Sequence, residues 1–234
     1  MIKYQGISTL EVLKEAKNYN KWIADELLIH ITSPALEIGA GTGNLTRFFL
    51  KKKPIYITDI DSGLVKDLKR KFSGEKYVTV RVFDVTKKPP KALRSFFPTV
   101  FGINVLEHLE EDDTALKNIH SILKKNGKLL VLVPAKRRAY TRLDKELGHF
   151  RRYEKKELSE KLTKNGFRVE RIYFFNIVGL ISWYFRDKAT HSKDINLKSH
   201  HIAIFDSIVP ILRFVESKIK IPVGISLIAI ARKL

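Results

Sequence analysis

The chain of 234 residues is long enough to bury one substantial core, and its 44 Lys plus Arg against 25 Asp plus Glu give a formal net charge of +19. It contains no cysteine, which excludes disulfides, thiolate metal sites, iron–sulfur clusters and a cysteine nucleophile. The positive charge favours nucleic acid, an anionic membrane or a phosphorylated substrate as partner, with lysines solvated on helix faces as the alternative. Because the N-terminus lacks a signal-peptide segment and no apolar run could span a bilayer, we expect a cytoplasmic protein, with peripheral contact at the inner membrane face as an option.

The first predicted element is an amphipathic helix, or a pair of helices, between residues 8 and 31. Apolar side chains recur there at intervals of three and four, which is the period of a helix with one buried face. We expect residues 1–33 to form a helical cap ahead of the first strand.

The segment 36–46 organises the rest of the chain, because an apolar run ends there in three alternate glycines and then becomes helical near Asn44. Gly39, Gly41 and Gly43 allow positive φ and the close approach of a ligand to the backbone. Their amides, with the N-terminus of the helix, are predicted to face the polar end of a cofactor. A dinucleotide-binding turn would need glycine where this sequence has Asn44.

Strands and helices then alternate, which predicts a parallel sheet with helices on both faces and ligands at the carboxyl ends of the strands. The predicted strands are 54–60, 77–83, 99–105 and 128–134, and the predicted helices are 62–72, 91–97 and 111–124. Three of the strands end in a polar residue, namely Asp59, Asp84 and Asn104. Asp59 stands about twenty residues after the first glycine, where a carboxylate can accept both ribose hydroxyls. For Asp84 and Asn104 the alternative is loop capping.

Three strings carry a resemblance to a known family. Glu37 precedes the first glycine by two residues, and this E-x-G-x-G-x-G pattern resembles motif I of class I S-adenosylmethionine-dependent methyltransferases. The string Asn-Val-Leu-Glu-His at 104–108 is similar to the small-molecule, type 11-like branch and unlike the Pro-Pro motif of enzymes that methylate base amines. The string Gly-His-Phe-Arg-Arg-Tyr at 148–153 is similar to a bacterial and archaeal group of undefined substrate.

The resemblance implies a Rossmann-like α/β fold with a seven-stranded, mostly parallel sheet and an antiparallel C-terminal strand. The closing strands are expected at 169–175 and 226–232. The cofactor it implies is S-adenosylmethionine, with S-adenosylhomocysteine as product. The implied cofactor-binding residues are Tyr19, Trp22, Glu37, Gly39, Ala40, Gly41, Gly43, Asn44, Asp59, Ile60, Asp84, Val85, Asn104 and Val105. Among these, Asp84 would hold the adenine amino group with Val85 beside the ring, and Tyr19 and Trp22 would line the pocket or else pack in the core.

In some relatives a Glu–His pair at this point of the chain, together with a Glu three residues upstream, binds a divalent ion. Here the pair is Glu107 and His108, but the upstream residue is Asn104. We therefore expect no metal site.

The loop 135–153 leaves a strand at its carboxyl end, so it should overhang the reactive methyl group. Its arginines, of which Arg138, Arg151 and Arg152 are the candidate substrate-binding residues, suit a carboxylate or phosphate. Salt bridges within the loop are the alternative. For catalysis, His149 is the first candidate base and His108 the second, with Tyr153 orienting the acceptor.

The segment 176–224 is too long for a simple connection between two strands, which predicts a helical insertion, read as a substrate lid, an interfacial helix, a dimer contact or core. We expect methyl transfer to an oxygen, less readily a nitrogen, of a small, anionic or lipid- or sugar-linked acceptor. The alternatives are an RNA methyltransferase or nucleic-acid-binding protein, a peripheral membrane enzyme, and a dinucleotide oxidoreductase.

Overall fold

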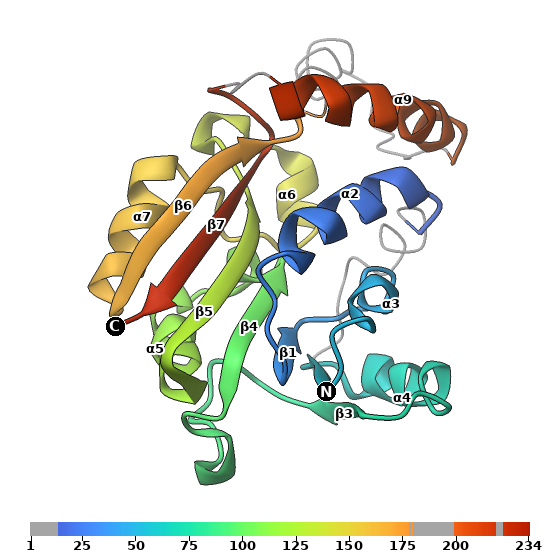
Figure 1. Cartoon of the computed structure of the whole chain (residues 1–234). Helices are drawn as coiled ribbons and strands as arrows, with labels where there is room; N and C mark the ends of the chain where they lie inside the picture. Colours follow the sequence, from blue (N-terminus) through green and yellow to red (C-terminus); the bar gives the residue numbers. More distant parts are fainter. Residues whose placement is uncertain (1–13, 178, 180–198, 219–221) are drawn as a thin grey trace.

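The computed structural model describes residues 14–177, 179, 199–218 and 222–234 (Figure 1). A seven-stranded sheet lies at its centre, in the order β3-β2-β1-β4-β5-β7-β6. The strands are β1 (Ala35–Ile38), β2 (Ile55–Asp59), β3 (Val78–Val82), β4 (Phe97–Ile103), β5 (Leu123–Pro134), β6 (Phe167–Phe175) and β7 (Ser226–Lys233). The first five run parallel, and β7 is antiparallel to both of its neighbours. This confirms the predicted Rossmann-like α/β fold.

Helices cover both faces of the sheet (Figure 1). They are α2 (Lys17–Leu28), α3 (Thr46–Phe49), α4 (Ser62–Lys71), α5 (Asp112–Ile122), α6 (Arg142–Glu146), α7 (Lys155–Lys164) and α9 (Ser199–Lys218), with short 3-10 turns η1 (Lys91–Leu93), η2 (Leu106–His108) and η3 (Arg137–Ala139). One buried cluster joins α5 and α7 to one face of the sheet, and a second joins α2, α3, α4 and α9 to the other. The central strand β1 is buried at all four positions, as expected of a parallel strand covered on both sides.

Several element boundaries differ from the sequence-based prediction. The helix expected from Asn44 begins at Thr46 and is four residues long, and its N-cap, Leu45, offers no side-chain acceptor to the first amides. The last helix runs through Pro210 without ending there. The predicted segment 8–13 lies outside the described residues, as do 178, 180–198 and 219–221 of the predicted insertion.

The described part of the insertion packs on the N-terminal helix. Asp206 of α9 accepts hydrogen bonds from the amides of Asn18 and Tyr19 at 3.0 and 2.9 Å, and Arg213 pairs with Asp25 at 2.6 Å. These contacts place α9 beside α2 (Figure 1). Within the residues that the structure describes, every helix is too short or too polar to cross a bilayer.

Candidate active site

The three alternate glycines form the turn that the sequence predicted. Gly39, Gly41 and Gly43 have φ of +67, +57 and +71°, which is the left-handed region that side chains disfavour. A Cβ on Gly39 would also lie 2.6 Å from Cγ2 of Val105. The turn therefore depends on glycine for both its backbone conformation and its packing.

Two carboxyl groups lie against this turn. Asp59, at the end of β2, accepts hydrogen bonds from Gly41 N at 2.8 Å and Asp61 N at 3.0 Å, so its carboxylate faces the glycines. Each oxygen keeps a second lone pair for a further donor. Glu37 is buried in β1, and its Oε2 has no hydrogen-bond partner among the described residues. Burial raises the pKa of Glu37 to about 8, and the nearby Asp59 carboxylate adds to that effect.

A pH dependence follows from the buried acid. Glu37 titrates near pH 4.5 when unfolded and near 8 when folded, so between these values the folded state holds the extra proton and stability falls as the pH rises. We expect Glu37→Gln to be more stable than the wild type by about 1–3 kcal/mol at pH 8.5, and the difference to vanish near pH 4.5. Urea unfolding of both proteins across this range measures it, with the exposed Glu160→Gln as control. A difference independent of pH would contradict the buried acid.

The polar residues after β3 and β4 occupy different environments. Asp84 Oδ1 accepts from the amide and hydroxyl of Thr86 at 2.9 and 2.6 Å, which is the loop cap named as the alternative. The side chain of Val85 is buried among core residues, which favours a hydrogen bond from its backbone over stacking of its side chain on an adenine ring. Asn104 is exposed with φ +52°, a conformation that asparagine tolerates better than most residues.

The N-terminal aromatic residues are mainly core residues. Trp22 is buried and its ring centroid lies 4.4 Å from that of Phe175. Tyr19 is half-buried against Trp22, Phe175 and Phe205. Of the two expectations for Trp22 the structure supports core packing, because the amphipathic face of α2 covers the sheet there.

Residues 104–108 continue from β4 past the glycine turn. Val105 packs on Gly39. Two residues further along the chain Glu107 is fully buried, and the next residue, His108, is half-buried. Neither carboxyl oxygen of Glu107 has a hydrogen-bond partner in another described residue. Burial raises the pKa of Glu107 to about 8, and burial together with the neighbouring His149 lowers the pKa of His108 to about 4.

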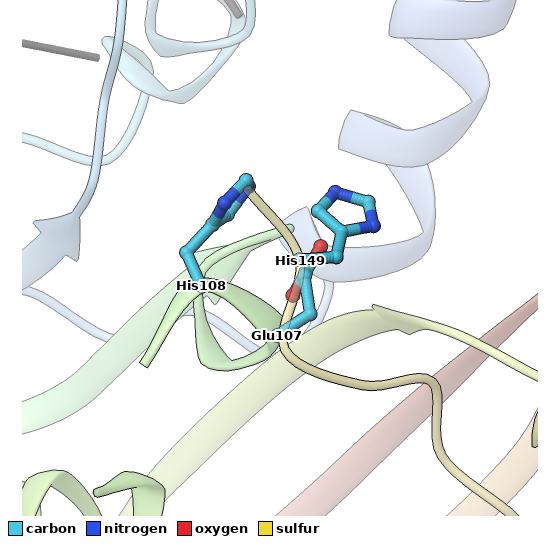
Figure 2. A group of neighbouring side chains, drawn as sticks. All are labelled: Glu107, His108 and His149. Carbon is cyan, nitrogen blue, oxygen red and sulfur yellow. The ribbon is translucent and has the colours of Figure 1, made fainter. Parts of the chain in front are cut away.

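His149 comes from a distant loop to meet these two residues. Its ring lies edge-on to that of His108, with centroids 4.6 Å apart, and Figure 2 shows the two rings and Glu107 together. Asp144, a buried residue of α6, holds His149 Nδ1 at 2.8 Å. With Nδ1–H donated to that carboxylate, Nε2 of His149 is left as an acceptor.

The string at 148–153 anchors its loop more than it faces a ligand. The amide of Phe150 donates to the carbonyl of Glu107 at 2.8 Å, and Arg151 pairs with Asp112 at 3.2 Å. Asp112 also accepts from the hydroxyl of Tyr153 at 2.8 Å. Tyr153 is fully buried, so its expected role in orienting the acceptor is wrong. Its hydroxyl instead satisfies the buried carboxylate of Asp112.

The arginines of the loop also divide into anchors and free groups. Arg152 is buried and its Nε donates to Asp144 at 2.8 Å, which corrects its expected role in gripping the substrate. Arg137 pairs with Glu157, and Arg142 with Glu146. The alternative of salt bridges within the loop thus holds for Arg142 and Arg152, while Arg137 and Arg151 pair with acids outside the loop. Arg138 is exposed and makes no ion pair with any described residue. An open hollow of about 480 Å³ on this loop is lined by Arg137, Tyr140, Phe150, Arg151, Arg152 and Glu157.

Comparison with known proteins identifies the class. A family model described as a methyltransferase domain matches residues 36–129. A highly reducing polyketide synthase of Alternaria alternata is 33% identical over 116 residues, covering 45% of this chain and 4% of the synthase. An uncharacterized methyltransferase of Schizosaccharomyces pombe is 32% identical over 114 residues, covering 48% of this chain and 43% of that protein. The chain thus spans less than half the length of these curated relatives.

The fold agrees with that match. A chain from the complex between the Haloferax volcanii Trm112 methyltransferase activator and a methyltransferase superposes with a TM-score of 0.68 at 14% identity, covering 99% of each chain. Residues 36–129 thus match a methyltransferase domain, and the chain around them has the fold of class I methyltransferases. The cofactor of this class is S-adenosylmethionine.

The residues at the glycine turn fit this cofactor. S-adenosylmethionine carries a sulfonium and an ammonium, and the buried Glu37 has an oxygen without a partner among the described residues beside the turn. Asp59 keeps lone pairs for ribose hydroxyls, and a Cβ in place of Gly39 would remove the close approach. Ala40, Asn44 and Ile60 lie in or next to the same turn, with Ile60 exposed. A ribose and a cationic methionine end thus find complementary groups here.

Two functional features were not recognised in the sequence. Asp144 was considered only as a salt-bridge partner, yet it orients His149 and forms a capping box with Thr141. The Thr-x-x-Asp spacing was the available signal for the helix start. The meeting of Glu107 with His149 had no local signal, because 42 positions of chain separate them.

Proposed function

We propose that the chain transfers the methyl group of S-adenosylmethionine to an oxygen of a small acceptor that is anionic or linked to a lipid or sugar. The observation that carries this proposal is the His149–Asp144 pair, next to the loop that packs on the glycine turn. An imidazole whose ring is fixed by a carboxylate suits an acceptor hydroxyl, which must lose a proton during transfer. A nitrogen or carbon acceptor is the alternative within the same class.

The described residues would divide the work as follows. When bound, S-adenosylmethionine supplies an activated methyl group on its sulfonium. The glycine turn, Asp59 and Glu37 align the cofactor, so that the methyl group is presented toward the loop of His108 and His149. His149 activates the acceptor oxygen, and Asp144 holds its ring. Arg138, the exposed arginine of the loop, attracts an anionic group of the acceptor.

The apolar surface of α9 supports a lipid-linked acceptor and peripheral membrane contact. Ile204, Ile208, Ile211 and Phe214 are all exposed, at 60, 43, 66 and 64%. Their spacing places them along one side of the helix. In this proposal the insertion 176–224 acts as the lid over the acceptor.

Transfer into cell fractions tests the proposed acceptor class. With S-adenosylmethionine labelled in its methyl group, we expect label in the organic-soluble or small-molecule fraction of a cell extract and none in purified RNA. Label confined to RNA would contradict the proposal.

Replacing His149 tests the acceptor side separately. We expect His149→Ala to lower methylation of the labelled fraction by about 100-fold or more while the affinity for S-adenosylhomocysteine changes less than about twofold. Calorimetry measures the affinity, and His120→Ala, in the last turn of α5, is the control. Undiminished methylation by His149→Ala would remove this residue from the chemistry.

An RNA methyltransferase is the second candidate, favoured by the net charge of +19. Phosphate-backbone binding would weaken steeply between about 50 and 200 mM salt. A small acceptor with one anionic group gives a much shallower dependence than a phosphate backbone that makes many contacts, so the steepness of the salt dependence of acceptor binding separates the two functions.

A further inference from the structure

We infer that Glu107, His108 and His149 form a binding site for a divalent transition-metal ion. One ligand atom from each residue, a carboxylate oxygen or an imidazole nitrogen, lies within 4.8 Å of the other two. Figure 2 shows the three side chains converging from η2 and from the loop after α6. This arrangement does not need the acid at position 104 that the sequence comparison required.

Both imidazoles are prepared as ligands by a second partner. His149 Nδ1 is held by Asp144 at 2.8 Å, and a ring nitrogen of His108 hydrogen-bonds to the backbone of Gly148. Metal-binding histidines commonly donate their other ring N–H to a carboxylate or a backbone carbonyl in this way, which fixes the tautomer and leaves the remaining nitrogen for the metal. The short segment 144–149 therefore supplies both His149 and the second partner of each ring.

Glu107 is the third observation, and it is independent of the histidines. Its side chain is fully buried, and both oxygens lack a hydrogen-bond partner in another residue of the described chain. A buried carboxyl in that state is costly unless a cation or donor satisfies it. The charge of Arg152 acts on Glu107, but its Nε donates to Asp144 and its Nη1 to the carbonyl of Ala135. A metal ion between Glu107 and the two rings would satisfy the carboxylate.

The ligand set indicates the kind of metal. Two imidazoles and one carboxylate suit Zn²⁺ and its neighbours in the first transition row, whereas Mg²⁺ and Ca²⁺ favour oxygen ligands throughout. Three protein ligands leave at least one position open for an oxygen of another molecule.

Metal binding by these three residues does not depend on the proposed function. Only the catalytic role of the metal, described next, rests on it. An acceptor hydroxyl bound at the open position would release its proton to solvent, because the cation lowers the pKa of the hydroxyl. Its oxygen then forms the new C–O bond as the S–CH₃ bond breaks, and the sulfonium becomes a neutral thioether. With the ion bound, the lone pair of His149 Nε2 goes to the metal, so His149 then acts as a metal ligand in place of the base role proposed above. Val105, packed on Gly39, keeps the site beside the cofactor turn.

Metal binding can be measured without any acceptor. We expect protein treated with chelator to take up one equivalent of Zn²⁺, and to bind Co²⁺ with the visible absorption of a site of low coordination number. Glu107→Gln and His149→Ala should each weaken Co²⁺ binding by about 100-fold or more. The control His120→Ala should keep wild-type uptake and spectrum. Because Glu107→Gln keeps the size of the side chain and removes a buried acid, it separates loss of a ligand from loss of the fold.

The outcomes distinguish the metal site from the proposed function. The site would be overturned if Glu107→Gln and His149→Ala bound the metal as well as the wild type and the control. It would also be overturned if wild-type protein that still binds S-adenosylhomocysteine bound neither Zn²⁺ nor Co²⁺. In either case the cofactor assignment stands. Stoichiometric metal binding that depends on Glu107 and His149 supports the site, even if no methyl transfer is found.

Discussion

Replacing Gly39 by alanine is expected to weaken the binding of S-adenosylhomocysteine by about 100-fold or more and to lower the free energy of unfolding by about 1–3 kcal/mol. The residue has φ +67°, and the new Cβ would lie 2.6 Å from Cγ2 of Val105, so the turn must move away from the position that receives the cofactor. Calorimetry with S-adenosylhomocysteine and unfolding in urea measure the two effects.

The chain offers a matched control for this substitution. Gly74 has no atom within 4 Å of an added Cβ, so Gly74→Ala should change stability by less than about 0.5 kcal/mol and leave cofactor affinity unchanged. A double variant, Gly39→Ala with Val105→Ala, removes the clash and keeps the strained φ, so it should recover part of the stability. Wild-type affinity in Gly39→Ala alone would mean that the turn does not touch the cofactor.

Replacing Asp144 by alanine is expected to cost about 3–5 kcal/mol of stability, because it leaves the buried guanidinium of Arg152 without its carboxylate. Asp144 is 1% exposed and holds Arg152 Nε and His149 Nδ1, each at 2.8 Å, as well as the amide of Thr141. Although burial opposes ionisation, the hydrogen bonds from His149 and Arg152 hold the pKa of Asp144 at about 2. Urea unfolding of the variant at neutral pH measures the loss.

Two further variants define the cause. Asp67→Ala removes an exposed carboxylate that pairs with Arg70, and it should cost less than about 1 kcal/mol. The double variant Asp144→Ala with Arg152→Ala should be less destabilised than the sum of the single variants, because no buried charge is left unpaired. Additive effects would show that the two side chains do not depend on each other.

The parts of the site that could be predicted are those written in one short stretch of sequence. The glycine turn needs only Gly39, Gly41 and Gly43 in succession, and Asp59 follows because the end of a neighbouring parallel strand must lie at the same edge of the sheet. Strand periodicity and the alternation with helices were sufficient to predict a parallel sheet with helices on both faces. In these cases the residue types that the local sequence pattern calls for are also the ones that the folded sheet needs at those positions.

The parts that could not be predicted depend on packing between distant segments. Tyr153 and Arg152 belong to the most specific string of the chain, and the sequence offered no sign that Asp112 and Asp144 would engage them in the interior. The arginines of the loop 135–153 were expected to bind an anionic ligand. In the structure most of them pair with nearby acids instead. The joining of Glu107 with His149 likewise follows only from the hydrogen bond between Phe150 N and Glu107 O.

The hydrogen bonds from Asp206 to the start of α2 bear on how this chain could be shortened or recombined. Ala16, the residue that caps α2, provides no side-chain acceptor, so the first amides of the helix rely on a carboxylate 188 positions later. Excising the long excursion between β6 and β7 would thus leave the opening helix without its cap and expose the aromatic residues beneath it. The excursion is not a detachable module, and grafting it onto a shorter relative would require the matching Asn-Tyr segment to travel with it.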